Sequence, residues 1–117
     1  MFTAWERLHG ATLELAGAGP IKQRLVCAYS NHLAFLKEEQ LPREVRDDCG
    51  ALARAMHAVR PLPGEEAVRA SVRKMSDREA NRHAVQIVNL YGAVARGHTS
   101  GRVASPMPVV QLLAAEA

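Results

Sequence analysis

Aromatic residues are scarce in this chain of 117 residues, which contains two phenylalanines, two tyrosines and one tryptophan. β-Sandwiches rely on β-branched and aromatic side chains to fill the space between their sheets. A core made mainly of Leu, Val, Ile and Ala suits helices that approach each other closely. No alternation of apolar and polar residues is long enough to build a sheet. The composition therefore favours an all-α fold.

Cysteines and long apolar runs are also sparse. Cys27 and Cys49 are too few and too widely spaced for a disulfide framework or a zinc site. Two reduced thiols are typical of a cytoplasmic protein, and we expect that location. No apolar run approaches the length of about 18 residues that a membrane span needs, and no basic region precedes an apolar run at the N-terminus. The sequence thus predicts neither export nor a membrane partner.

Charge of one sign is not in large excess. The net charge is +3, and acidic residues between Glu38 and Asp48 offset much of the basic content locally. An excess this small does not by itself imply a nucleic-acid partner. The hydrophobic fraction of 48% lies in the globular range, and the length suits one domain with its own core.

Glycine, proline and capping residues divide the chain into helices. Capping-box patterns, S/T-x-x-E, mark two helix starts at Thr3 and Ser76, while Pro20 and Pro42 suit first helical positions. Apolar residues recur at helical spacing between these signals. The predicted helices cover about residues 3–16, 20–38, 42–60, 65–74 and 76–96.

These segments predict a small antiparallel helical bundle of four main helices plus one short helix, at about 65–74. The bundle would occupy residues 1–96. The following residues, 97–117, lack periodicity at first and then turn apolar, so they predict a linker and an extended C-terminal arm. An apolar arm of this kind is expected to dock on its own bundle or on a neighbouring subunit.

The second predicted helix is apolar over about half of its circumference. Such a helix needs packing partners on two sides, so it lies either at the centre of the bundle or in a subunit interface. Together with the arm, it supplies the candidate interface residues: Val26, Tyr29, His32, Leu33, Val109, Val110, Leu112 and Leu113.

Basic residues gather on the fourth and fifth predicted helices. If these helices form a helix-turn-helix-like pair at about 65–96, the start of the fifth presents groups suited to bases and phosphates. Asp77 and Glu79 argue against this hypothesis, because they would lie close to the phosphates. A solvated basic face paired with neighbouring acids is the alternative. The candidate nucleic-acid or partner-binding residues are Arg69, Arg73, Lys74, Arg78, Asn81 and Arg82.

No spacing of chemical groups predicts catalysis or a metal site. His9 and His32 project onto apolar faces and Cys49 onto an inner face, but no H-x-x-x-H or C-x-x-C pair accompanies them. The pattern Glu6-x-x-His9 occurs once, whereas helical di-iron proteins need it twice. We interpret the histidines as core or interface residues, and we expect no cofactor, no metal and no catalytic residues.

The sequence therefore predicts a small cytoplasmic regulatory or protein-protein interaction protein without catalytic activity. Its expected partner is a second copy of itself, in a homodimer, and another protein is possible as well. A DNA- or RNA-binding regulator is the alternative.

Overall fold

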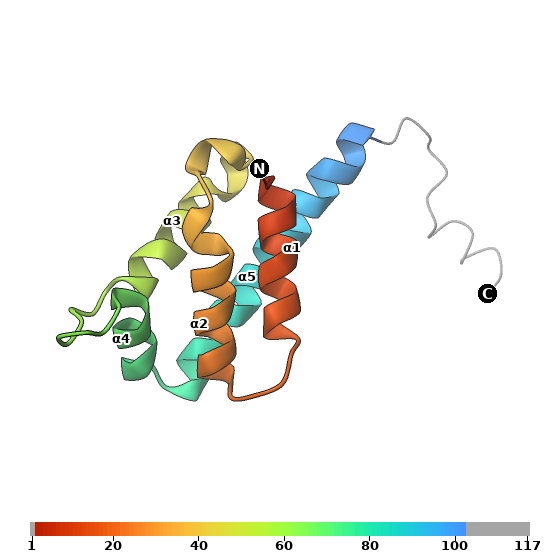
Figure 1. Cartoon of the computed structure of the whole chain (residues 1–117). Helices are drawn as coiled ribbons and strands as arrows, with labels where there is room; N and C mark the ends of the chain where they lie inside the picture. The colour runs from red at the N-terminus through yellow and green to blue at the C-terminus, as the bar shows by residue number, and fades with distance from the viewer. Residues whose placement is uncertain (1, 103–117) are drawn as a thin grey trace.

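A computed structural model describes the backbone of residues 2–102 and the side chains of residues 2–97. Within this part of the chain every regular element is helical, which confirms the predicted all-α fold. Figure 1 shows the arrangement. The elements in chain order are α1 (Ala4–Leu15), α2 (Ile21–Asn31), the 3₁₀ turns η1 (Leu33–Phe35) and η2 (Glu38–Gln40), α3 (Arg43–Met56), the short α4 (Ala67–Lys74) and α5 (Asp77–Arg102).

The bundle is organised around α2. Helices α1 and α2 run antiparallel, and α5 crosses behind both of them, while α3 and α4 lie on the other side of α2 (Figure 1). Helix α2 packs against α1, α4, α5 and η1, and α5 also contacts α1 and α3. The sequence predicted that this apolar helix lies either at the centre of the bundle or in a subunit interface. In the structure it lies at the centre of the bundle.

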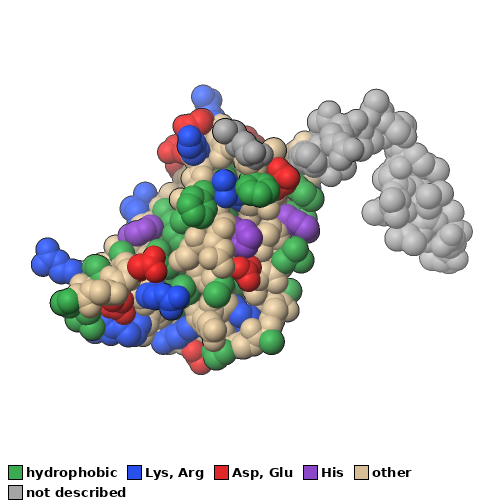
Figure 2. Space-filling model, viewed as in Figure 1, with side chains coloured by type: hydrophobic (Ala, Val, Ile, Leu, Met, Phe, Trp, Pro, Cys, Tyr) green, Lys and Arg blue, Asp and Glu red, His purple; other side chains and the backbone are tan. Residues whose placement is uncertain are grey.

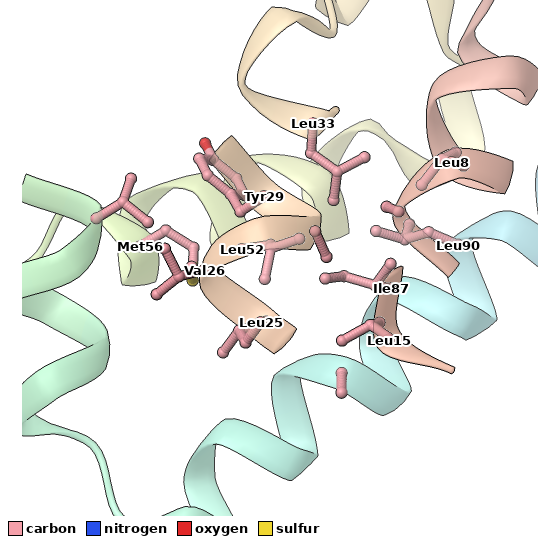
Figure 3. Close-up of a cluster of buried hydrophobic side chains, with 14 of the residues drawn as sticks. Leu8, Leu15, Leu25, Val26, Tyr29, Leu33, Leu52, Met56, Ile87 and Leu90 are labelled. Carbon is pink, nitrogen blue, oxygen red and sulfur yellow. The ribbon is translucent and has the colours of Figure 1, made fainter. Parts of the chain in front are cut away.

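The core is built from aliphatic side chains contributed by all five α-helices. Leu25 and Ala28 of α2 are completely buried, and Ile87 of α5 is buried beside them (Figure 3). Because Ala28 has a short side chain, neighbouring backbones can approach α2 closely. The sparse aromatic content is thus compatible with a well-filled core.

Two of the predicted helix starts have the expected capping residues. The Thr3 hydroxyl accepts a hydrogen bond from the Glu6 backbone N–H at 3.1 Å, and the Glu6 carboxylate accepts one from the Thr3 N–H at 2.9 Å. This reciprocal pair confirms the first capping box. At the start of α5, the Ser76 hydroxyl accepts from the Glu79 N–H at 3.0 Å.

The predicted end of the second helix was wrong. Helix α2 stops at Asn31 instead of about Glu38, because His32 leaves helical geometry with φ −130° and ψ −58°. The chain then continues through η1, whose Leu33 is still buried in the core. Apolar residues spaced three apart fit a 3₁₀ turn as well as an α-helix. The spacing of apolar residues therefore does not predict where α2 ends.

Three other predicted boundaries differ from the structure. Helix α3 ends at Met56 rather than at about residue 60, because His57 leaves helical geometry with φ −123° and ψ 17°. Helix α4 starts at Ala67 rather than about Glu65, because the Glu65 carboxylate accepts a hydrogen bond from the Leu62 N–H in the preceding turn. Helix α5 continues to Arg102, past the predicted end at Arg96. Glycine weakens a helix without ending it, and no proline interrupts this stretch. The predicted apolar arm lies outside the described residues.

None of the helices described between residues 2 and 102 is both long and apolar enough to cross a membrane.

Two leucines allow a matched test of the core. Leu52 on α3 is 1% exposed and Leu62 in the α3–α4 loop is 59% exposed. We expect Leu52→Ala to lower the free energy of unfolding by about 2–5 kcal/mol, because it leaves a cavity in the core. Leu62→Ala should change it by less than about 0.5 kcal/mol. Urea denaturation followed by circular dichroism measures both. Equal effects of the two substitutions would contradict the packing described here.

Candidate functional site

The basic residues of α4 are already paired with acidic residues. Arg73 donates two hydrogen bonds to the Glu65 carboxylate, at 2.9 and 3.1 Å. This contact lowers the pKa of Glu65, with a smaller contribution from the hydrogen bond of the Leu62 N–H, and it raises the pKa of Arg73. Arg69 lies 3.7 Å from the Glu66 carboxylate. The basic face of α4 is therefore largely neutralised, as the alternative of a solvated, paired surface had predicted.

Four of the six candidate nucleic-acid- or partner-binding residues line three different grooves. Arg69 and Arg73 line a groove between α2 and α4. Asn81 lines a groove between α1, α2 and α5, whereas Arg82 lines one between α3 and α5. Lys74 and Arg78 are exposed. None of the three grooves contains all six residues.

The predicted interface residues of the second helix belong to the core of the single chain. Val26, Tyr29 and Leu33 are 6–8% exposed. They are buried by the chain's own helices, so they are not available to a second subunit, and this part of the interface prediction was wrong. His32 is half-buried and lies against Glu14. The other four candidates, Val109, Val110, Leu112 and Leu113, lie outside the described residues.

The histidines and cysteines of the described residues do not come together in a possible metal site. The His9 ring stacks on Trp5 with ring centroids 4.9 Å apart, and Tyr91 lies 5.7 Å from His9. His32 Nε2 lies 3.3 Å from the Glu14 carboxylate. Among residues 2–97, no group of three or more His, Cys, Asp or Glu side chains is arranged to hold a metal ion.

Cys49 is a half-buried thiol on α3. Burial raises its pKa, and the negative charge of Glu38 raises it further. Burial likewise raises the pKa of Tyr29, with a smaller contribution from Cys49. A thiol with a raised pKa carries little thiolate at neutral pH, so it is a poor nucleophile.

An exposed apolar surface lies along α5. Val85 is 52% exposed and Val88 is 44% exposed. They line a groove of about 320 Å³, whose other apolar residues are Leu15, Ala16, Ile21 and Ala84. We call Val85, Val88 and these four residues the α5 face.

A second hollow was not predicted from the sequence. It has a volume of about 350 Å³ and lies over the N-terminal half of α1 and the end of α2. We call it the Arg7 pocket, and its lining residues are Phe2, Trp5, Glu6, Arg7, His9, Gly10, Asn31 and His32. The sequence offers no motif for it, because it depends on the break in the chain at His32.

Searches with this chain against protein-family models, curated proteins and solved structures gave no match.

The raised pKa of Cys49 predicts slow alkylation. In a Cys27→Ser variant, which isolates Cys49, iodoacetamide at pH 7 should modify the folded chain several-fold more slowly than the chain unfolded in urea, because unfolding restores the ordinary thiolate fraction. Raising the pH should speed the folded-state reaction. Mass spectrometry follows the modification, and equal rates for folded and unfolded chain would contradict the burial of this thiol.

Proposed function

We propose that this chain is a non-catalytic interaction protein that forms a homodimer through the α5 face. The observation that carries the proposal is the position of Val85. This exposed side chain borders two grooves, one between α1, α2 and α5 and the other between α3 and α5. An apolar ridge between two grooves is the shape that fits a second copy of itself.

The geometry of helix pairs supports a second copy as the occupant. Helices pack by inserting the side-chain ridges of one helix into the grooves of another. In a two-fold symmetric dimer the same surface is used by both copies, so it must contain both ridge and groove. The α5 face meets this condition, since Val85 of each copy can enter the groove beside Val85 of the other.

Charge supports the same pairing. The groove between α3 and α5 contains Asp48 and Arg82, and both side chains are exposed. In a two-fold arrangement of two α5 helices, each copy offers one positive and one negative group near the contact. Such a surface is complementary to itself, whereas a surface of one sign would repel its copy.

The proposed compartment is the cytoplasm. Cys27 and Cys49 are both free thiols in the structure, as expected for a protein of a reducing compartment. A regulatory role, exerted through the dimer or through another protein on the same face, is part of the proposal.

Light scattering coupled to gel filtration tests the homodimer. The wild-type chain should have about twice the chain mass of 12.7 kDa. Val85→Glu should give a monomer, because it places a charge in the apolar contact. Leu62→Glu is the matched control, since Leu62 is 59% exposed on the α3–α4 loop against 52% for Val85, and this variant should remain dimeric. A monomeric wild-type chain with an intact circular dichroism spectrum would overturn the homodimer.

The nucleic-acid alternative has less support, because Arg69 and Arg73 are paired with glutamates. The proposal predicts no retardation of a 20-base-pair duplex or of single-stranded RNA in a gel at low salt. A retarded complex that weakens steeply with salt, and that is lost in an Arg78→Ala/Arg82→Ala variant, would favour the alternative instead. Arg43→Ala is the control for loss of positive charge elsewhere.

A further inference from the structure

Arg7 has an unusual environment for a surface arginine. Its guanidinium carbon lies 5.4 Å from the centre of the Phe2 ring and 5.3 Å from that of Phe35. Both rings are more than half exposed. On the face drawn in Figure 2, a basic side chain lies between hydrophobic side chains over the N-terminal end of α1. The two rings hold the planar guanidinium in place by cation–π contact.

Among the described residues, no hydrogen bond uses the Arg7 guanidinium. Its Nε–H is shielded from solvent and has no acceptor. No carboxylate of the described residues forms an ion pair with it. A shielded N–H of a charged group that lacks an acceptor is uncommon in folded proteins and calls for an explanation.

The two acidic residues near the Arg7 pocket, Glu6 and Glu14, already have other partners. The Glu6 carboxylate accepts the hydrogen bond from the Thr3 N–H that completes the capping box. Glu14 accepts a hydrogen bond from the Asn31 amide at 2.9 Å and lies 3.3 Å from His32 Nε2. Arg7 is therefore the charged group of the Arg7 pocket that lacks a hydrogen-bond or ion-pair partner among residues 2–97.

The walls of the Arg7 pocket suit a flat ring. Phe2 and Trp5 contribute aromatic surfaces, and His9 is stacked on Trp5 at an interplanar angle of 13°. The opposite wall is polar, with Asn31 and His32. An apolar hollow with a few convergent polar groups is typical of a small-molecule site.

The position of the His32 ring in the pocket requires a glycine at position 10. A Cβ atom at position 10 would lie 2.5 Å from His32 Nδ1, so Gly10 allows the imidazole to rest directly on the α1 backbone. Glu14 fixes the imidazole from the other side. The pocket is thus preformed, because its polar wall is held by contacts independent of any ligand.

We propose that the Arg7 pocket binds a small planar anion, an aromatic ring that carries a carboxylate. The carboxylate pairs with the guanidinium of Arg7, and the ring lies against Phe2 and Trp5. A cation is disfavoured, because Arg7 itself occupies the space between the two phenylalanines. This site does not involve the α5 face, and its test is independent of the homodimer.

The single tryptophan of the chain, Trp5, lines the pocket and reports binding directly. Titration of the full chain with benzoate should change the Trp5 fluorescence saturably, with one site per chain by calorimetry. Benzamide has the same ring and no charge, so its affinity should be lower by about tenfold or more. Arg7→Met should lose benzoate affinity by a similar factor, and Arg43→Met, an exposed arginine on α3, should not.

A further variant keeps the test decisive if Arg7→Met does not fold. Phe2 is 58% exposed, so Phe2→Ala should retain the fold while it removes one wall of the pocket and weakens benzoate binding several-fold. The proposal is overturned if benzoate gives no saturable signal, if benzamide binds as well as benzoate, or if a folded Arg7→Met or Phe2→Ala variant binds benzoate like the wild type.

Discussion

The packing of α2 against three other α-helices is the constraint on which the rest of the structure depends. Leu25 and Ala28 are completely buried, and α1, α4 and α5 each pack against this helix. Packing one helix against three neighbours removes much apolar surface from water with few aromatic side chains. It also determines which faces of the outer helices remain free. The α5 face exists because α5 turns one side toward α1 and α2 and leaves Val85 outside.

The sequence predicted the fold class and most helix positions correctly, because these depend on local signals. The capping box at Thr3 and Glu6 depends on residues three positions apart, and helical periodicity depends on residues three and four apart. The end of α2 was not predictable in this way. It depends on His32 packing over Gly10, which is a contact between residues distant in sequence.

The candidate sites were less predictable than the fold for the same reason. A helical wheel shows that Arg69 and Arg73 are exposed, but it does not show that Glu66 and Glu65 pair with them. It places Val26 and Leu33 on a broad apolar face without deciding between the bundle centre and a subunit interface, and tertiary packing buries both within the chain. The Arg7 pocket combines α1 with the end of α2 and has no sequence motif at all. Surfaces made by several elements require the three-dimensional arrangement.

The contact between Gly10 and His32 has a consequence for how this chain can change during evolution. Any side chain at position 10 collides with the imidazole, while a smaller residue at position 32 would leave a hole above the glycine. Neither position can therefore vary alone without disturbing the chain reversal after α2. In related sequences that keep this fold, the two positions are expected to be exchanged as a pair, with a larger residue at one accompanied by a smaller residue at the other.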